Sequence, residues 1–215
     1  MTAEGVEFAQ VSYTPASGAS ILKDVSLVLA PGTTTALLGR SGSGKTTLLR
    51  MVNALVLPSQ GSVRVGGRAT SDWPLLDLRR SIGYVIQESG LFPHWTVERN
   101  AGLALELLGR PRTQIAARVD EVLAATGLSA DLRGRFPWQL SGGQRQRAGL
   151  ARALASEPGI LLMDEPFGAL DPITRAEMQN MVKDLLARVR KTVLLVTHDL
   201  DEALFLAERV VFLSD

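Results

Sequence analysis

The sequence of 215 residues contains no cysteine. Its absence excludes disulfide bonds, thiolate zinc sites, iron–sulfur clusters held by cysteine, and cysteine nucleophiles, and it is compatible with a reducing compartment. The sequence also lacks low-complexity segments and repeats of fixed period. It therefore gives no sign of a repeat architecture, and the length favours one large domain or a core that carries an inserted subdomain.

No excess of either charge is present, since 23 basic and 22 acidic residues leave a net charge of +1. Proteins that bind nucleic acid broadly normally carry a basic excess, so we expect no nucleic-acid partner. Hydrophobic residues make up 46% of the chain and charged residues 21%. These shares are ordinary for a globular protein long enough to bury a substantial core.

Long hydrophobic runs are missing as well. The longest, such as VLLV and ILLM, fall far short of the roughly 20 residues that cross a bilayer. The first residues, MTAEGVEFAQ, lack the basic start and the apolar stretch of a secretory signal. We expect a chain that does not span a membrane alone but could dock onto a protein that does.

Four short segments are apolar at nearly every position, namely residues 34–39, 81–87, 159–165 and 192–198. Strands covered on both faces of a parallel sheet have this pattern. Helical patterns separate them, for example at residues 44–55 and 174–190. The alternation predicts an α/β fold with a mainly parallel core sheet flanked by helices.

Two further regions depart from this alternation. Residues 6–15, 20–32 and 61–67 are short, half-alternating runs broken by Pro and Gly, which predict an N-terminal antiparallel β layer. Residues 96–109 and 112–128 have helical patterns. We therefore expect a single domain over 1–215, with its α/β core and β layer in 1–87 and 141–215 and an inserted helical subdomain in 88–140.

The segment GRSGSGKT, from Gly39 to Thr46, matches the pattern G-x-x-x-x-G-K-[ST] between an apolar strand and a helix. Its glycines let successive backbone N–H groups face phosphates, Lys45 would reach the β- and γ-phosphates, and the Thr46 hydroxyl would ligate Mg²⁺. The residues predicted to bind nucleotide here are Gly39, Arg40, Ser41, Gly42, Ser43, Gly44, Lys45, Thr46 and Thr47.

Two adjacent carboxylates end the third apolar run, GILLMDE. Asp164 would hold Mg²⁺ through water, at the usual ligand crevice of an open α/β sheet. Glu165 could orient and deprotonate an attacking water. A surface acidic pair that caps the next helix is the alternative, and the phosphate loop at Gly39–Thr46 argues against it.

A second glycine-containing helix start follows about a hundred residues later, in LSGGQRQRAGLARALA, from Leu140 to Ala155. A glycine pair at a helix start is a phosphate-binding device. We interpret Arg147 and Arg152 in the helix that follows as part of a solvated face.

Several motifs occur in a fixed order: GRSGSGKT, Gln87, LSGGQ at Leu140–Gln144, LLMDE, ALD at Ala169–Asp171, and TH at Thr197–His198. Together they resemble the nucleotide-binding subunit of an ABC transporter, over essentially the whole chain. The resemblance implies the P-loop NTPase fold of ABC-type ATPases, ATP and Mg²⁺ as ligands, and ATP hydrolysis coupled to transport.

The resemblance also implies roles for single residues. Tyr13 matches the aromatic residue that stacks on adenine. Gln87 matches the residue that touches Mg²⁺ and water while it senses the membrane partner, and His198 matches the switch histidine at the γ-phosphate. The implied catalytic set is Glu165, His198, Lys45 and Gln87, and the implied metal set is Thr46, Gln87 and Asp164. His94 matches no catalytic position, and we interpret it as a surface loop residue.

In this family two subunits pack head to tail, which explains the second glycine pair. Ser141, Gly142, Gly143 and Gln144 of one subunit would close over the γ-phosphate held by the other, together with Asp171. The positive helix N-terminus adds to the attraction. The resemblance thus implies a dimer with ATP sandwiched between two copies of this chain.

A loop rich in aromatic residues follows Gln87. Phe92, Pro93 and Trp95 put large apolar groups between Gln87 and Asn100, and such a patch often marks a partner surface. The resemblance implies that transmembrane permease subunits dock there, at the cytoplasmic face of the membrane, with a solute-binding protein as an indirect partner.

Finer similarity lies in LLRMVNALVLPSQGSVRVGG and LRRSIGYVIQESGLFPHWTVERN. These segments are similar to ATPases of osmoprotectant importers, for glycine betaine, choline and related quaternary amines. The ATPase never touches the solute, so polar amino-acid importers stay an alternative. A soluble ABC ATPase without a transport role and a non-hydrolytic binding module are two further candidate functions, and the single cassette and the intact motifs argue against them.

Overall fold

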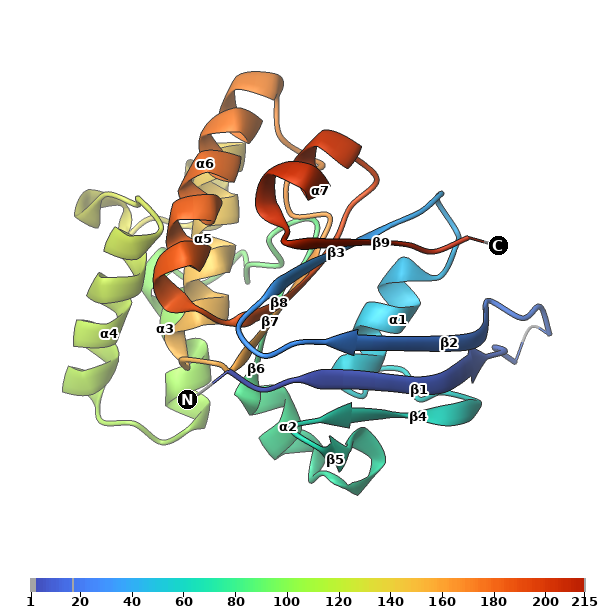
Figure 1. Cartoon of the computed structure of the whole chain (residues 1–215). Coiled ribbons are helices and arrows are strands. Elements are labelled where there is room, and N and C mark those ends of the chain that lie inside the picture. The colour runs from blue at the N-terminus through green and yellow to red at the C-terminus, as the bar shows by residue number, and fades with distance from the viewer. Residues whose placement is uncertain (1–2, 17, 215) are drawn as a thin grey trace.

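The computed structural model describes residues 3–16 and 18–214, which form two β-sheets flanked by helices (Figure 1). The larger sheet is parallel, in the order β6-β7-β8-β3-β9. Its strands are β3 (Thr34–Leu38), β6 (Ile82–Val85), β7 (Ile160–Asp164), β8 (Thr192–Val196) and β9 (Arg209–Phe212). The four predicted core strands and the α/β class are confirmed. Strand β9 was not predicted, because it is a four-residue edge strand without a fully buried residue.

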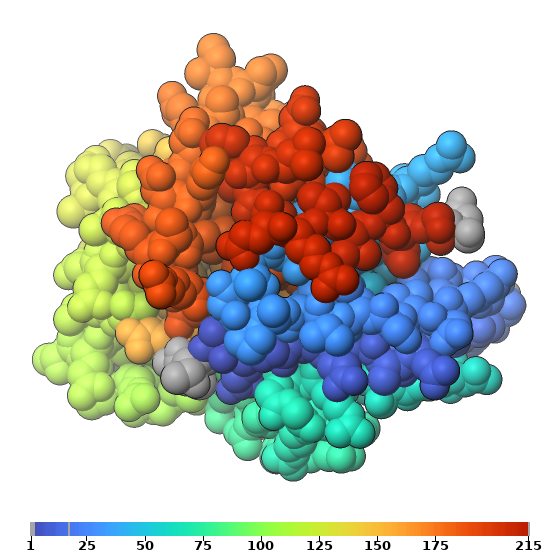
Figure 2. All heavy atoms as spheres, in the orientation of Figure 1, coloured from blue at the N-terminus to red at the C-terminus, as the bar shows by residue number. Residues whose placement is uncertain are grey.

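The smaller sheet is the predicted antiparallel β layer, in the order β2-β1-β4-β5. It comprises β1 (Val6–Tyr13), β2 (Leu22–Leu29), β4 (Gln60–Val65) and β5 (Arg68–Ala69). Buried residues such as Val6 and Phe8 alternate with exposed ones along β1, as expected for a sheet with one solvated face. Figure 2 shows β1 and β2 of this layer in blue, and β4 and β5 in teal, beneath the C-terminal segment in red.

Seven α-helices lie within the described residues. They are α1 (Lys45–Val52), α2 (Leu75–Ser81), α3 (Val97–Leu107), α4 (Arg112–Ala125), α5 (Gly142–Ala155), α6 (Pro172–Val189) and α7 (Leu200–Leu206). Short 3₁₀ turns add η1 (Thr70–Asp72), η2 (Ala130–Leu132) and η3 (Pro137–Gln139). Helices α2 and α7 were not predicted, because two turns are too short to establish a helical period. No helix in residues 3–16 and 18–214 has both the length and the apolar composition needed to span a bilayer.

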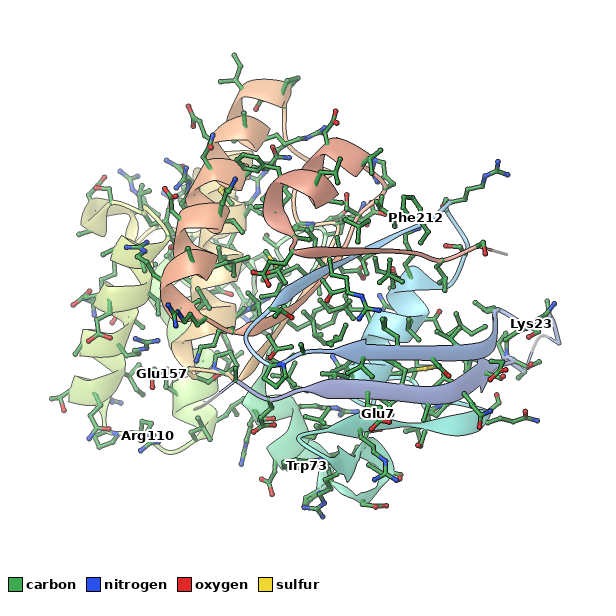
Figure 3. The ribbon with its side chains drawn as sticks, in the orientation of Figure 1. Glu7, Lys23, Trp73, Arg110, Glu157 and Phe212 are labelled. Carbon is green, nitrogen blue, oxygen red and sulfur yellow. The ribbon has the colours of Figure 1, made fainter. Side chains whose placement is uncertain are left out.

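The parallel sheet separates two hydrophobic cores. Along β7, Leu161 and Met163 face the core shared with helices α3–α7, whereas Ile160 and Leu162 face the core shared with the β layer and α1. All five β7 residues are buried, which explains the uninterrupted apolar run in the sequence. Side chains fill the space between the layers (Figure 3), with Lys23 at one side of the molecule and Arg110 and Glu157 at the other.

The fold brings the predicted motifs to one edge of the sheet. Strands β3, β6, β7 and β8 are parallel neighbours or near neighbours, so their carboxyl ends share that edge. The phosphate loop follows β3, Gln87 follows β6, Glu165 follows β7 and His198 follows β8. Ligands of open α/β sheets bind at this edge.

Candidate active site

The phosphate loop, Gly39–Thr46, connects β3 to α1 and needs glycine at two turns. Gly42 and Gly44 have φ angles of +88° and +90°, a region that side chains disfavour. A Cβ atom on Gly44 would also lie 2.7 Å from the Leu22 side chain. No side chain caps the N-terminus of α1, so its first N–H groups are available to an anion.

Lys45 is folded back across this loop. Its Nζ donates hydrogen bonds to the carbonyl oxygens of Gly39 at 2.8 Å and Arg40 at 2.7 Å, and the residue is buried. Ser43 Oγ is buried without a hydrogen-bond partner, so a ligand would complete its bonding. Around them Arg40, Ser41 and Gly42 are exposed or half-buried, and Thr47 is half-buried.

A second contact joins the phosphate loop to β7. The Thr46 hydroxyl donates a 2.9 Å hydrogen bond to Asp164 Oδ1 across 118 residues of sequence. Both groups are hard oxygen donors of the kind Mg²⁺ prefers, so the donor set fits the expected metal. Within the described residues no cluster of three His, Asp or Glu side chains could hold a metal alone, so ligand oxygens would have to complete the coordination.

Sequence reasoning missed two residues behind Asp164. The Tyr84 hydroxyl donates to Asp164 Oδ2 at 3.3 Å, and Arg50 Nε donates to the same hydroxyl at 3.4 Å. Burial raises the pKa of Tyr84, partly opposed by the hydrogen bond from Arg50. Both residues lie in segments predicted as strand and helix, and nothing in the sequence separates them from ordinary packing residues.

Glu165 lies between two other predicted residues. Gln87 Nε2 donates to Glu165 Oε2 at 3.4 Å, and His198 Nδ1 lies 3.5 Å from the same oxygen. Glu165 has φ of +45°, which is uncommon and strained for a residue with a side chain. Its N–H donates to the Val196 carbonyl at 2.9 Å, which anchors this turn to β8.

Tyr13 is linked to the phosphate loop by its strand partner, Leu22, in the β layer. It is half-buried at the end of β1 and is paired in register with Leu22 of β2. The Leu22 side chain in turn packs against Gly44, so closely that it leaves no room for a Cβ atom there. Tyr13 is therefore one residue pair away from the loop expected to hold phosphate.

The signature segment, Leu140–Gln144, forms the start of α5. The Ser141 hydroxyl accepts a hydrogen bond from the Gln144 N–H at 3.2 Å, and the Gln144 side chain accepts from the Ser141 N–H at 2.9 Å. This reciprocal cap fixes the helix start. A Cβ on Gly143 would lie 2.5 Å from Thr174, and Gly142 faces Leu170. The start of α5 thus packs tightly on the start of α6.

Asp171 caps α6 beside this segment. Its carboxylate accepts from the Thr174 N–H at 3.1 Å, and hydrogen bonds from the Thr174 side chain and backbone lower the pKa of Asp171. Among the described residues, no hydrogen bond or ion pair joins the signature segment or Asp171 to the phosphate loop. The chain therefore displays two separate groups of predicted phosphate ligands.

The interpretation of Arg147 and Arg152 as a solvated face is wrong. Arg147 Nη1 donates to the Thr126 carbonyl at 2.9 Å, and Arg152 donates to the carbonyls of Ser89 and Gly90 at 2.9 and 2.5 Å. Burial lowers the pKa of Arg152. These side chains satisfy backbone carbonyls, and Arg152 ties α5 to the segment just after Gln87.

The aromatic loop after Gln87 is ordered around Asn100, which is fully buried. Its side chain accepts from the Phe92 N–H at 2.7 Å and donates to the carbonyls of Phe92, Trp95 and Thr96. Phe92 and Trp95 rings lie 4.5 Å apart, and Phe92 is 39% exposed. His94 is exposed next to Trp95, in agreement with its interpretation as a surface loop residue.

A cavity of about 320 Å³ lies between α2, β6, α3 and α5, and Arg152, which lines it, also bonds to Ser89 and Gly90. Its lining includes Tyr84 and Arg152 together with Leu76, Leu107 and Leu108. The three leucines are 65%, 61% and 37% exposed, an unusual number of open leucines on one groove.

Known proteins are similar to this chain over nearly its whole length. Residues 22–168 match the family model described as ABC transporter. The chain is 47% identical over 209 residues to the glycine betaine uptake system ATP-binding protein YehX of Escherichia coli, covering 97% of this chain and 68% of that protein. It is 48% identical over 199 residues to the Fe(3+) ions import ATP-binding protein FbpC 2 of Rhodococcus jostii, covering 92% of this chain and 56% of that protein.

A solved structure is also similar. The dimeric post-hydrolysis state of the ATP-binding cassette MJ0796, bound to ADP and Pi, has a TM-score of 0.86 and 35% sequence identity. The match covers 97% of this chain and 94% of that chain.

Proposed function

The chain belongs to the ABC transporter family, and we propose that it binds and hydrolyses ATP to power solute import through a separate permease. The observation that carries this function is the convergence at one sheet edge. Thr46 meets Asp164 there, and Gln87 and His198 meet Glu165. Hydrolysis of a phosphoanhydride needs a phosphate cradle, a metal position and a base for water. We assign these tasks to the loop Gly39–Thr46, to Thr46 with Asp164, and to Glu165.

Lys45 and Glu165 have distinct tasks in this proposal. Lys45 exchanges its carbonyl partners for the β- and γ-phosphates and balances the charge that develops during cleavage. Glu165 takes a proton from the attacking water. The water oxygen bonds to the γ-phosphorus while the bond from that phosphorus to the β–γ bridging oxygen breaks, which yields ADP and phosphate. Gln87 and His198, both beside Glu165 Oε2, orient the carboxylate and the water.

Mg²⁺ would be held by Thr46 and Asp164, with Gln87 as a further ligand that follows β6. When bound, the metal neutralises phosphate charge. Tyr84 and Arg50 keep the Asp164 carboxylate oriented toward this position.

The signature segment, Leu140–Gln144, would bind phosphate only in a dimer. We propose that Ser141, Gly142, Gly143, Gln144 and Asp171 of one copy close over the nucleotide held by Lys45 of the other. The separation of these groups within one chain supports this arrangement, as does the dimeric state of the related cassette bound to ADP and Pi. Each chain would then carry two half-sites.

The permease is proposed to dock on the groove lined by Leu76, Leu107 and Leu108 and on the loop from Gln87 to Asn100. Exposed leucines beside an ordered aromatic loop offer an apolar surface for a helix of a membrane protein. This arrangement would hold the chain at the cytoplasmic face of the membrane, and a solute-binding protein would deliver solute on the other side. We also propose that residues 88–140 form an inserted helical subdomain, which contributes Leu107, Leu108 and the aromatic loop to this surface.

Glycine betaine and related quaternary amines are the proposed solute class. The support is the relative YehX, which covers nearly all of this chain. Similar identity to an Fe(3+) importer shows that solute class varies within this range of similarity. Polar amino acids stay the alternative solute, and a soluble ATPase role is disfavoured by the near-neutral charge.

Reconstitution with the cognate permease tests the proposal. ATP-dependent uptake of glycine betaine into vesicles, lost in Lys45→Ala, is the expected result. Hydrolysis without uptake of any solute would overturn the transport role, and absence of both ATP binding and hydrolysis would overturn the whole proposal.

A further inference from the structure

Glu202 is a buried acid that the active site does not use. It lies in the first turn of α7, four residues after His198, and is only 5% exposed. Acidic side chains are almost never this buried unless a partner compensates their charge. Its presence next to the predicted switch histidine therefore requires a reason.

Among the described residues, the hydrogen-bond partners of the Glu202 carboxyl are neutral side chains. Gln179 Nε2 of α6 donates to Oε2 at 3.5 Å, and the Thr197 hydroxyl approaches the carboxyl as a hydrogen-bond donor. Oε1 is buried and makes no hydrogen bond of ordinary geometry, and nearby Arg175 Nε is also buried without a partner. An under-satisfied buried carboxyl of this kind is costly to keep.

Hydrogen bonds also fix the residues on either side of His198, whose own side chain is 65% exposed. The Asp199 N–H donates to Thr197 Oγ1 at 3.1 Å, and the Glu202 N–H donates to Asp199 Oδ1 at 3.1 Å. Together with the hydrogen bond from Thr197 to the Glu202 carboxyl, these bonds tie the switch loop, Thr197–Asp199, to the start of α7 before and after His198. The His198 ring points out of this loop toward Glu165.

The same carboxyl connects the switch loop to α6. Helix α6 begins after Asp171, and its Arg175 donates to the Leu170 carbonyl at 3.1 Å, next to that aspartate. Gln179 lies one turn further along and reaches Glu202. Lys183, a turn beyond, stacks on Phe205 of α7 at 4.0 Å. Glu202 is thus a polar contact between the His198 loop and the helix that begins after Asp171.

We propose that Glu202 is a positioning residue for ATP hydrolysis, which fixes the switch loop under His198 and couples that loop to α6. The inference rests on the proposed function, because it assigns no chemistry of its own to Glu202. Neither Glu202 nor Thr197 is expected to touch nucleotide, so kcat should change while KM for ATP should not.

Because Glu202 can ionise, its role should make kcat depend on pH, which a role in packing alone would not. Burial raises the pKa of Glu202 to about 7, opposed by Thr197, Gln179 and Arg175 and assisted by Asp199. Strand β3, which also packs against α7, has only uncharged residues. The ionised carboxylate accepts more strongly from Thr197 than the protonated acid, so the loop is held best above neutral pH.

The test compares Glu202→Gln and Glu202→Ala with the wild-type chain, and Asp201→Asn serves as an exposed control on the same helix. We expect Glu202→Ala to lower kcat about tenfold or more with KM for ATP within about twofold, and Glu202→Gln to recover part of the loss. The ratio of wild-type to Glu202→Gln kcat should rise at least about threefold between about pH 6 and pH 8.

Each outcome decides the inference. A wild-type to Glu202→Gln ratio that stays constant with pH, or a kcat for Glu202→Ala equal to that of Asp201→Asn, would overturn it while the proposed function stands. A wild-type chain that neither binds nor hydrolyses ATP would overturn both. If Glu202→Ala does not fold, the pH-dependent ratio for Glu202→Gln still decides.

Discussion

His198 Nδ1 lies 3.5 Å from Glu165 Oε2, although the two residues follow different strands. The same oxygen accepts from Gln87, so three segments meet at a single carboxylate atom. A base held by two neighbours on a strained turn is positioned before substrate arrives. Changes at this carboxylate should therefore affect the rate of hydrolysis more than the binding of ATP.

Glu165→Gln should remove the base and keep the shape of the site. We expect ATP binding to persist and kcat to fall by about 10²–10⁴-fold, because an amide cannot accept the proton of the attacking water. A dimer with trapped ATP should accumulate, measurable by size-exclusion chromatography. Glu157→Gln, at an exposed residue just before β7 and so at the opposite end of that strand from Glu165, is the control. Normal turnover in Glu165→Gln would show that another group activates the water.

Thr46→Val should separate metal binding from phosphate binding. The change removes the hydroxyl that donates to Asp164 at 2.9 Å but retains the branched shape. We expect the enhancement of ATP affinity by Mg²⁺ to decrease about tenfold or more, with little change in affinity measured in EDTA. Thr46→Ser keeps the hydroxyl and should behave as wild type. Equal Mg²⁺ dependence in Thr46→Val and wild type would remove Thr46 from the metal site.

Glu202 should make stability depend on pH. Its pKa is raised from 4.5 to about 7, so the folded chain binds the proton more tightly than the unfolded chain. Titration of Glu202 then leaves the free energy of unfolding unchanged below about pH 4.5 and lowers it as pH rises from about 4.5 to about 7. Above about pH 7 the Glu202 contribution is constant. The total loss is up to about 3 kcal/mol, since each pKa unit corresponds to about 1.4 kcal/mol.

Glu202→Gln should abolish this loss. Urea unfolding at about pH 5 and pH 8 would show the variant gaining stability over wild type only at the higher pH. An identical change with pH in both proteins would contradict the raised pKa. A buried acid that costs stability and yet persists is expected at a functional position.

Leu107→Glu tests the docking groove. Leu107 is 61% exposed and lines the cavity between α2 and α3. We expect the charge to weaken binding to the permease and to abolish uptake while ATP hydrolysis by the chain alone stays unchanged. Leu204→Glu, at a leucine of α7 that is 64% exposed, is the matched control. Equal uptake in both variants would place the permease elsewhere.

The sequence predicted the buried parts of the fold better than its edges. Strands β7 and β8 are buried on both faces, so their apolar runs were unambiguous. Strand β9 and helix α7 owe their form to pairing with β3 and packing on α6, which local pattern does not encode. Arg152 was misinterpreted for the same reason, since its carbonyl partners lie more than 60 residues away in the sequence.

The candidate site divides in a similar way. Lys45, Asp164 and Glu165 lie in motifs whose spacing is informative on its own. Tyr84 and Glu202 occupy positions that ordinary core residues share, and only the contacts with Asp164 and Thr197 distinguish them. Long-range side-chain geometry is what the sequence could not supply.

In the proposed dimer, each active site combines the phosphate loop of one copy with the signature segment of the other. Ser141→Arg fills the space over the partner nucleotide, and Lys45→Ala removes the phosphate-binding ammonium. Lys45→Ala alone should bind ATP poorly, and Ser141→Arg alone should bind ATP as a monomer but fail to close as a dimer. Each variant alone should therefore hydrolyse almost no ATP.

Mixing the two variants tests whether the two chains share their active sites. A dimer of one Ser141→Arg chain and one Lys45→Ala chain contains one intact site, built from the unchanged halves of both. We predict that an equimolar mixture recovers about a quarter of wild-type hydrolysis, since about half of the dimers are mixed and each has one of two sites. A mixture as inactive as its components would contradict a site shared between two chains.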